Sequence, residues 1–403
     1  MKIIIQKFGG TSVITKENRE KVVSKIESAI NNGFSPVIVV SAMGRKGDPY
    51  ATDTLVQFIQ DIFSETNPHE MDLLLSCGEI ISAVVLASTL KSKGLTGHVL
   101  TGGQAGIITN QNYGNSTILK VDPYNIEKVL ANGEIPIVAG FQGVSEDGNI
   151  TTLGRGGSDT TAAILGEALK ALQIEIYTDV DGIMTADPRV VPNAAVLNTI
   201  HYSEVFQIAD QGAKVIHPKA VEIAMRCNIP LIIKNTMNES PGTIISSYPS
   251  DNTIEMKDNR VITSIANILN RSQITVTNLD ADAEKNILFA LANDNISIDL
   301  INIFPDKMIF TIDSCYLNKA EESLKACNNT YRIISNCAKI SIIGNRMRGI
   351  PGIMSRIIRT LVLHHIEVLQ TSDSHTTISC LINDKDTTRA IVCLHEEFEL
   401  WRT

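Results

Sequence analysis

Two glycine-rich segments, far apart in the sequence, most constrain what this chain folds into. The first, Lys7-Phe8-Gly9-Gly10-Thr11-Ser12, ends a short apolar run, and the second, Gly154-Arg155-Gly156-Gly157-Ser158-Asp159-Thr160, opens an apolar helical pattern. Each sets backbone N–H groups beside a long cation, Lys7 or Arg155. Glycine lets a phosphate approach the backbone closely, and N–H groups at a helix start attract anions. Together the segments predict an enzyme that holds a phosphate and a second anion.

Over roughly the first 235 residues, short apolar runs alternate with helical patterns, which is typical of a parallel α/β sheet. Buried strands are expected at residues 3–5, 37–40, 135–139, 174–177 and 231–233, with an edge strand at 242–245. Helices are expected at residues 18–31, 79–93, 123–131, 158–172 and 218–227. Ligands of such sheets bind beyond the carboxyl ends of the strands, where both glycine-rich segments fall.

The rest of the chain contains a divergent internal repeat. A strand–helix–strand–strand–helix unit of about 65 residues occurs twice, which is a ferredoxin-like pattern. Its helices are expected at residues 283–293 and 354–364, and its later strands at 296–299, 308–312, 366–368 and 377–382. We therefore predict an α/β protein with an open, mainly parallel sheet sandwiched by helices, plus two ferredoxin-like units. The expected boundaries are residues 1–245, a linker at 246–260, then 261–336 and 337–403.

Composition excludes several classes of protein. The chain has 403 residues and a net charge of −9, which opposes binding to nucleic acid because that requires a basic face. Its seven cysteines form no C-x-x-C pair, so we expect reduced thiols and no metal site built from them. The amino terminus runs directly into a predicted strand, and no apolar run approaches the ~20 residues of a membrane span. We therefore expect a cytoplasmic protein.

Lys7 precedes two glycines at the predicted end of the first strand. Its ammonium could hold the oxygens of a transferring phosphoryl group, or the segment could be a tight turn between strand and helix. The residues alone leave both interpretations open. The chain contains no G-x-x-x-x-G-K-[ST] motif, which disfavours a P-loop fold.

Three predicted helix starts carry groups that could also bind a substrate. Thr52 and Asp53 suit a helix cap. Glu79 ends Ser76-Cys77-Gly78-Glu79 before a clean helical pattern, where an acid in the first turn is ordinary; it could instead pair with a substrate ammonium. Arg155 between glycines is more specific, because a guanidinium grips a carboxylate with two parallel hydrogen bonds.

Acidic groups and a second lysine lie near other predicted strand ends. Asp159 could orient nearby lysines or share in metal binding. Asp179 and Asp181 suit a ribose, a Mg²⁺ shell or a turn. Lys214 alone would be a surface charge, but together with Lys7 it could bridge the β- and γ-phosphates of a nucleotide.

In combination these motifs resemble those of the aspartokinases, members of the amino-acid-kinase family with tandem ACT domains. Order and spacing agree over the whole chain, and the terminal repeat resembles the paired ACT domains. The loop at residues 44–50 and the stretch at 372–377 are most similar to the diaminopimelate-sensitive enzymes of Gram-positive bacteria. The matching segments are Lys7-Phe8-Gly9-Gly10-Thr11-Ser12-Val13, Ser76-Cys77-Gly78-Glu79, Gly154-Arg155-Gly156-Gly157-Ser158-Asp159, Thr178-Asp179-Val180-Asp181-Gly182, Asp187-Pro188-Arg189 and Gly212-Ala213-Lys214-Val215.

The resemblance implies an amino-acid-kinase-type fold and an activity. ATP and Mg²⁺ would serve to phosphorylate the β-carboxylate of L-aspartate, giving 4-phospho-L-aspartate in the first step of lysine, threonine and methionine biosynthesis. Feedback inhibition by meso-diaminopimelate, lysine or threonine would act through the ACT domains, which would also join the subunits of a homo-oligomer. Mg²⁺ would be held mostly by phosphates and water, so no side-chain metal site is expected.

The resemblance also implies roles for single residues. Catalysis would depend on Lys7, Asp159 and Lys214. The aspartate pocket would contain Thr52, Glu79, Arg155, Gly156, Gly157 and Ser158. ATP would contact Lys7, Phe8, Gly9, Gly10, Ser41, Thr178, Asp179, Met184, Arg189, Lys214 and Val215. An effector would bind near Asp299, Asn302, Pro351, Gly352, Met354 and Ser355.

Two other functions compete with this one. A related kinase could act on glutamate, acetylglutamate or a nucleotide, but Glu79 and Arg155 in one pocket favour a free amino acid. A non-catalytic amino-acid sensor is the second alternative, against which the complete set of phosphate-binding charges argues. The repeats could also serve as a dimerisation module that binds no effector.

Overall fold

The chain divides into two compact units. The computed structural model describes residues 1–63, 65–212, 216–247, 261–277, 281–326, 330–344, 347 and 350–402. The first unit comprises Met1–Ile183, Val196–Ala209 and Lys214–Ile254, and the second comprises Met184–Ala195, Asp210–Ala213 and Glu255–Thr403. Two short early segments of the chain therefore belong to the second unit. The predicted linker lies mostly at residues 248–260, outside the described residues.

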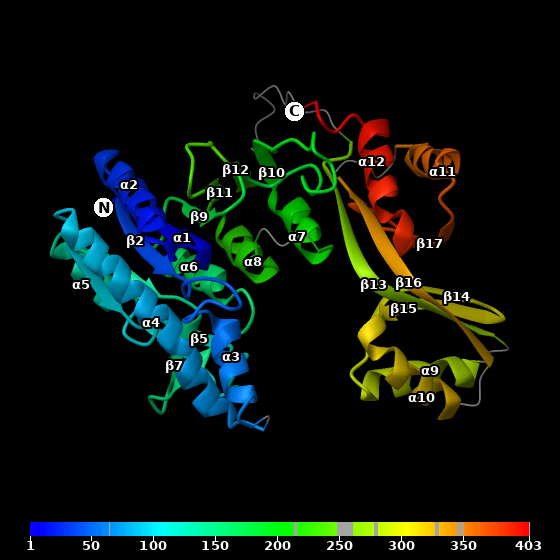
Figure 1. The fold of residues 1–403 in the computed structure, drawn as a ribbon, viewed down its shortest axis with the longest axis horizontal. Helices are drawn as coiled ribbons and strands as arrows, with labels where there is room; N and C mark the ends of the chain where they lie inside the picture. The colour runs from blue at the N-terminus through cyan, green and yellow to red at the C-terminus, as the bar shows by residue number, and fades with distance from the viewer. Residues whose placement is uncertain are drawn as a thin grey trace. The chain divides into compact units, whose positions relative to one another are not determined.

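An eight-stranded sheet forms the centre of the first unit (Figure 1). Its strands are β1 (Ile3–Phe8), β2 (Ser35–Val40), β3 (Gly97–Leu100), β6 (Ile135–Ala139), β9 (Ile174–Thr178), β10 (Thr199–His201), β11 (Leu231–Asn235) and β12 (Thr243–Ser246). The order is β10-β12-β11-β9-β1-β2-β6-β3, and β11 with β12 is the antiparallel pair. The predicted mainly parallel α/β fold is thereby confirmed. The predicted edge strand is present as β12, but β10 lies outside it in the sheet.

Helices cover both faces of this sheet. On one face, α2 (Lys16–Asn31) and α4 (Pro68–Ser92) pack their apolar residues against Phe8 and Ile38. On the other, α6 (Gly157–Ala168) lies so close that a Cβ on Gly166 would come within 2.6 Å of Ile174. The unit also contains α1 (Gly10–Val13), α3 (Thr52–Gln60), α5 (Tyr124–Ala131), α7 (Tyr202–Asp210) and α8 (Pro218–Cys227).

A second, four-stranded sheet of the first unit was missed by the sequence patterns. It has the order β5-β4-β7-β8, formed by β4 (Ile107–Thr109), β5 (Ile118–Val121), β7 (Gln142–Ser145) and β8 (Ile150–Thr152). Asp72 of α4 is fully buried and fastens the helix to this region. Its carboxylate accepts hydrogen bonds from Gly114 N at 3.0 Å, Thr152 N at 2.8 Å and Thr152 Oγ1 at 2.7 Å.

α4 begins eleven residues before the predicted helix at 79–93. Asn67 caps its first turn by accepting from His69 N at 3.0 Å, and Pro68 occupies a position where no N–H is needed. Glu79 therefore lies inside the helix, so the interpretation of Glu79 as an ordinary first-turn acid is wrong. α6, in contrast, ends four residues before the predicted end, because Lys170 has a φ of +50° and the chain turns toward β9.

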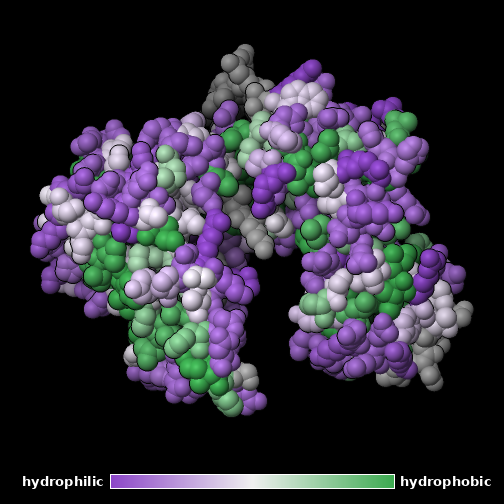
Figure 2. Space-filling view, viewed as in Figure 1, coloured by the Kyte–Doolittle hydropathy of each residue, from purple (hydrophilic) through white to green (hydrophobic). Residues whose placement is uncertain are grey.

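By length and composition, α4 is also apolar enough to cross a membrane, contrary to the sequence expectation. Among the helices that the structure describes, it is the one that meets this criterion. Asp72 and Glu79 on α4 are nevertheless buried inside the first unit, which identifies it as a core helix. Figure 2 shows apolar residues in the region of α3 and α4, where Phe58 and Leu73 are exposed.

The second unit contains a six-stranded antiparallel sheet in the order β14-β15-β13-β16-β18-β17. Its strands are β13 (Ser264–Thr277), β14 (Ile298–Phe304), β15 (Lys307–Asp313), β16 (Thr330–Ile343), β17 (Val368–Asp373) and β18 (Thr377–Asn383). Its helices are α9 (Ala281–Asn293), α10 (Leu317–Ala326), α11 (Ile353–Leu363) and α12 (Thr387–Glu397). The predicted ferredoxin-like repeat is present twice, each copy with two helices.

The two repeats share their longest strands. One end of β13 pairs with β16 at Ile265 and Ile342, and the other end pairs with it at Val276 and Tyr331. The edge strands β14 and β17 begin two residues later than predicted, because Asn295 and His365 adopt positive φ in the preceding turns. Since each long strand serves both repeats, the pair forms one interlocked sheet.

The early segment Met184–Ala195 is built into the second unit. Thr185 Oγ1 lies 2.9 Å from His395 Nε2 of α12, and both residues are fully buried. Ser264 Oγ donates to Met184 O at 3.1 Å, and Ile265 N donates to Thr185 O at 2.9 Å. This segment, which contains the predicted nucleotide contacts Met184 and Arg189, is thus held by the repeats.

We expect Asp72→Ala to lower the free energy of unfolding by about 3 kcal/mol, because the buried N–H and hydroxyl groups of Thr152 lose their acceptor, as does the N–H of Gly114. Urea denaturation measures this change. Glu70→Ala is the matched control, since Glu70 is an exposed acid in the first turn of the same helix. The control should cost no more than about 1 kcal/mol. Equal losses in both variants would contradict the structural role of Asp72.

Candidate functional site

The carboxyl end of β1 carries the first element of the site, an ion pair between Lys7 and Asp159. Lys7 Nζ lies 2.7 Å from Asp159 Oδ1, with 12% and 13% of the two side chains exposed. Asp159 belongs to the first turn of α6, and its other oxygen accepts from His217 N at 3.3 Å. The pair therefore joins the two glycine-rich segments and presents a largely desolvated ammonium at the sheet edge.

The turn after β1 packs closely against its neighbours, and of its two glycines Gly10 is the one that this packing requires. Gly9 N donates to Tyr177 O of β9 at 3.2 Å. A Cβ on Gly10 would lie 2.4 Å from Ala42 O, so no other residue fits there. The ring of Phe8 stacks on Tyr177 with 4.7 Å between centroids. The Phe8 side chain is fully buried. A ligand bound at this turn could therefore contact only the backbone of Phe8.

The chain after β2 approaches the same turn and the middle of α4. Ser41, a predicted nucleotide contact, donates its N–H to Phe8 O at 3.1 Å. Ala42 N donates to Glu79 Oε1 at 3.1 Å. A Cβ on Gly78 would lie 2.8 Å from the Ala42 side chain. Gly78 thus allows this loop to pack on α4 directly beside Glu79.

Glu79 is a buried carboxyl with an unused oxygen. Only 2% of the residue is exposed, and its Oε2 has no hydrogen-bond partner among the residues that the structure describes. Burial raises its pKa from 4.5 to about 8, and the hydrogen bond from Ala42 N offsets only part of that effect. Without a substrate the group is therefore largely protonated at neutral pH, and it would ionise beside a cation.

The second glycine-rich segment forms a left-handed turn before α6. Gly154 and Gly156 have φ of +73° and +68°, which glycine adopts without strain. A Cβ on Gly156 would lie 2.2 Å from His217 Cγ. Arg155 projects from this turn and is exposed, and it forms no ion pair with any described residue. Its guanidinium is therefore available to a carboxylate.

Ser158, in the first turn of α6, stands against the end of β6. A Cβ on Gly140 would lie 2.9 Å from its hydroxyl oxygen. Gly157, before it, has an equally close neighbour, since a Cβ there would lie 2.7 Å from the Phe141 ring. The predicted substrate contacts 155–158 are thus held by tight packing that only glycine permits at two positions.

The loop after β9 holds the predicted ribose or nucleotide contacts. Thr178 Oγ1 donates to Asp179 Oδ1 at 3.2 Å, and Arg45 of the loop after β2 forms an ion pair with Asp179. The Asp181 carboxylate accepts a hydrogen bond from Asn235 Nδ2 at 2.7 Å, which fixes this loop to the end of β11. Within the described ranges, no group of three acidic, histidine or cysteine side chains is placed to hold a metal.

The remaining predicted nucleotide contacts lie elsewhere. Met184 and Arg189 belong to the second unit, where the exposed Arg189 guanidinium pairs with Asp187 at 2.6 Å. This pairing lowers the pKa of the Asp187 carboxyl below its usual range. Lys214 and Val215 lie outside the described residues.

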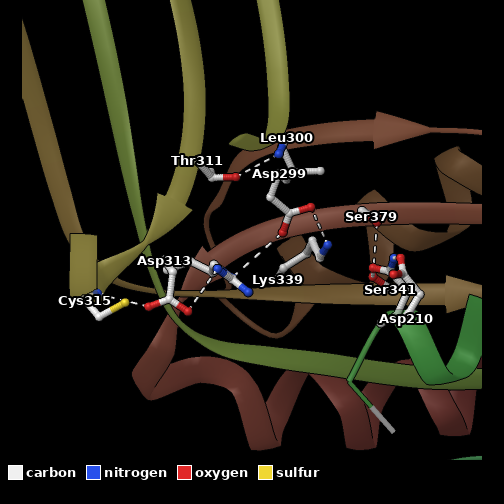
Figure 3. A network of polar contacts seen from close by, with 11 residues as sticks. Asp210, Asp299, Leu300, Thr311, Asp313, Cys315, Lys339, Ser341 and Ser379 are labelled. Atoms are coloured by element: carbon white, nitrogen blue, oxygen red, sulfur yellow. Dashed lines mark hydrogen bonds and ion pairs between the residues drawn. The ribbon is translucent and has the colours of Figure 1, made fainter. Parts of the chain in front are cut away.

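The predicted effector contacts of the first repeat are engaged within the second unit. Asp299 of β14 pairs with Lys339 Nζ of β16 at 2.6 Å, and only 4% of the lysine side chain is exposed (Figure 3). Asn302 Oδ1 accepts from Gln370 Nε2 of β17 at 2.7 Å. An effector ammonium would therefore compete with Lys339 for Asp299.

The effector contacts predicted in the second repeat surround the start of α11. Gly352 is its N-cap with φ of +95°, Pro351 and Ser355 are exposed, and Met354 packs partly against the core. These residues and the Asp299 region belong to different repeats, and both predictions stay open.

Thr52 is the first residue of α3, after an Ala51 N-cap, so it does not cap the helix. A separate cavity of about 310 Å³ lies between α3, α4 and the four-stranded sheet, and no predicted site residue lines it. The patterns missed two residues at the site, Arg45 and His217. The loop that contains Arg45 was noted in the sequence, but neither residue was given a role, because each acquires its partner only through the fold.

The comparisons with known proteins agree over both units. Residues 2–235 match the amino acid kinase family, and residues 332–396 match the ACT domain. The chain is 44% identical over 402 residues to aspartokinase 1 of Bacillus subtilis, covering 99% of this chain and 100% of that protein. It is 39% identical over 408 residues to an aspartokinase of Geobacillus stearothermophilus, covering 99% and 98%.

Solved structures show the same fold. Clostridium acetobutylicum aspartate kinase superposes with a TM-score of 0.80 at 24% identity, covering 98% of this chain and 100% of that one. E. coli aspartokinase III in complex with aspartate and ADP superposes with a TM-score of 0.76 at 24% identity, covering 98% and 99%. At these identities the likeness concerns the fold.

Glu79→Gln should change how the stability of the ligand-free protein depends on pH. The unfolded chain releases the Glu79 proton near 4.5 and the folded chain near 8. Between these values the folded state binds more protons, so the free energy of unfolding falls as pH rises. The variant should lose this component, as measured by urea denaturation between about pH 5 and pH 8. Glu70→Gln, exposed on the same helix, should keep the wild-type slope; equal slopes in all three proteins would refute the raised pKa.

Proposed function

The chain belongs to the amino acid kinase family and within it to the aspartokinases, and on this basis we propose how its residues phosphorylate L-aspartate. The protein has aspartate kinase activity, regulated through its ACT domains. One observation supports the proposed mechanism most directly. The Lys7–Asp159 pair and the loop beside Glu79 lie at the ends of the adjacent strands β1 and β2. The product would be 4-phospho-L-aspartate, a mixed anhydride that begins the synthesis of lysine, threonine and methionine.

The nucleophile needs no activation. The β-carboxylate of aspartate has an ordinary pKa of about 3.9 and is already ionised at neutral pH, so no general base is required. The difficulty is to bring an anion against a triphosphate. Catalysis is therefore a matter of positioning and of neutralising charge on the transferred group.

Lys7 supplies the positive charge at the transferring phosphoryl group. Asp159 holds its ammonium at 2.7 Å, so the cation stands ready in a defined position before substrate binds. A preorganised charge in a partly dry site stabilises the transition state more than a hydrated one. The motif that contains Lys214 assigns the same role to that residue, and the backbone N–H group of Gly10 completes the phosphate site, because the N–H of Gly9 is already bonded to Tyr177 O.

Glu79 and Arg155 recognise the two ends of the amino-acid substrate. The unused Oε2 of Glu79 accepts from the substrate ammonium, which drives the carboxyl to ionise and release its proton. Arg155 is exposed and forms no ion pair with the residues that the structure describes, so its guanidinium grips the α-carboxylate with two hydrogen bonds. Ser158 and Thr52 line the space between them. An N-acylated substrate would leave Glu79 without its cation, which favours free aspartate.

The nucleotide is ATP, in keeping with the ADP in the E. coli aspartokinase III complex. Asp179 and Thr178 are assigned to its ribose or phosphates. Met184 and Arg189, in the segment held by the repeats, keep the nucleotide contacts that the resemblance implies for them. Mg²⁺ bound with the nucleotide would need few protein ligands, because this ion sheds its water reluctantly. The ion would neutralise charge on the β- and γ-phosphates.

We further infer that the effector is an amino acid; a second E. coli aspartokinase III structure is a complex with lysine and aspartate. Among candidates, meso-diaminopimelate is favoured by the similarity to the diaminopimelate-sensitive group. The hydrogen bond between Thr185 and His395 gives a physical route from the repeats to the nucleotide segment. The subunits associate through the ACT repeats, and the enzyme works in the cytoplasm.

Lys7→Ala should lower kcat by about 100-fold or more while changing the KM for aspartate and ATP much less, because the lost charge acts on the transition state. The assay traps the acyl phosphate with hydroxylamine as aspartyl hydroxamate. Lys2→Ala, an exposed lysine just before the same strand, is the control and should keep wild-type activity. An unchanged kcat in Lys7→Ala would remove Lys7 from this role. If the wild-type enzyme formed a hydroxamate only from an amino acid other than aspartate, the substrate assignment would be overturned.

The same assay identifies the effector. We expect meso-diaminopimelate to suppress hydroxamate formation at saturating aspartate and ATP, with coupling of about 1–3 kcal/mol. Lysine and threonine are tested in parallel. Inhibition by lysine or threonine alone would overturn the assignment to the diaminopimelate-sensitive group, and no response to any of the three would contradict an effector of this class.

A further inference from the structure

We propose that Arg45 contacts the phosphates of ATP: its guanidinium, paired with Asp179 before the nucleotide binds, transfers to the phosphate tail when it does. This inference rests on the proposed nucleotide site and adds a residue to it. Arg45 lies in the long loop before α3, which no motif assigned to the reaction.

The order of the strands places Arg45 beside the phosphate turn. β1 lies between β9 and β2, and Phe8 at its end pairs with Tyr177 on one side and Val40 on the other. The turn at Gly9 and Gly10 is therefore flanked by the loops that follow β9 and β2. Because the ion pair between Arg45 and Asp179 joins these two loops, it spans the glycine turn.

The backbone of Arg45 is fixed while its side chain is free to move. Gly44 N donates to Gly10 O at 3.1 Å, which fastens the loop to the phosphate turn. Arg45 N donates to Asp48 Oδ2 at 2.7 Å, and Asp48 N donates back to Arg45 O at 2.8 Å. Gly44 has φ of +90°, and a Cβ there would lie 2.5 Å from the Asp48 carboxylate. The side chain of Arg45, however, is 68% exposed.

The charges favour an exchange of partners. The pair of Arg45 and Asp179 is exposed on both sides, and exposed ion pairs contribute little to stability. A triphosphate carries more negative charge than one carboxylate and accepts two parallel hydrogen bonds from a guanidinium. Lys7 is paired with Asp159, so a further cation beside the turn would add to the attraction for the incoming phosphates. The exchange also frees an oxygen of Asp179 for the nucleotide.

The test compares Arg45→Ala with Lys46→Ala, which removes the next residue's exposed cation from the same loop. Isothermal titration calorimetry measures ATP and ADP binding with Mg²⁺ and without aspartate. We expect Arg45→Ala to weaken ATP binding about ten-fold and ADP binding less, because ADP offers one phosphate fewer. Lys46→Ala should stay within about two-fold of the wild type. Arg45→Lys should recover part of the loss, since it keeps the charge but not the planar fork.

Several results would overturn the proposal. Unchanged ATP affinity in Arg45→Ala, or equal losses in both alanine variants, would exclude a specific contact. Tighter binding would mean that the pair obstructs the site. Arg45→Gln removes the charge but keeps the Cβ and Cγ methylenes and a polar end, and it replaces the alanine variant if that variant fails a thermal-unfolding check. Wild-type hydroxamate formation is measured separately, so a failure of the kinase assignment is distinguished from a failure of this proposal.

Discussion

The close approach of three backbone segments at the end of β1 is the constraint on which the first unit depends. A Cβ at Gly10 would lie 2.4 Å from Ala42 O, and one at Gly78 would lie 2.8 Å from the Ala42 side chain. Because Gly10 and Gly78 have no side chains, the loop after β2 can pack on the phosphate turn and on α4 at the same time. Lys7 and Glu79, on different elements, are brought to one edge of the sheet by this packing rather than by any contact with each other.

Two buried carboxylates on α4 show how the same helix serves structure and chemistry. Asp72 is fully buried, and both of its carboxylate oxygens accept hydrogen bonds, so it attaches α4 firmly to the four-stranded sheet. Glu79, two turns later, is almost as buried, but its Oε2 has no partner among the described residues. An orphaned buried oxygen is costly, and a raised pKa limits that cost before substrate binds. A substrate cation would remove the penalty, so binding gains free energy at this oxygen.

The second unit contains a chain segment to which the resemblance assigns nucleotide contacts. Residues 184–195 leave the first unit, pack among the repeats and return. Thr185 is tied to His395, and Ala186 and Val191 join the apolar core of the second repeat. A rearrangement of the repeats would therefore act on Arg189 directly, because they hold the residues on both sides of it. The long shared strands β13 and β16 make such a rearrangement collective, since neither repeat can shift its sheet alone.

The sequence by itself determined the parallel α/β sheet, the ferredoxin-like repeats and the glycine turns, because these follow from local apolar periodicity and from positions that only glycine can occupy. It also led to Lys7, Asp159, Glu79 and Arg155 as the groups of interest. Tertiary structure decided which of them meet: Asp159 reaches Lys7 from a segment about 150 residues away, and Arg45 finds Asp179 across the turn. Short strands such as β4 and β8 also escaped prediction, as did the true start of α4. Contacts between residues far apart in the sequence produce no local periodicity, so they could not be predicted from the sequence patterns and are seen only in the folded chain.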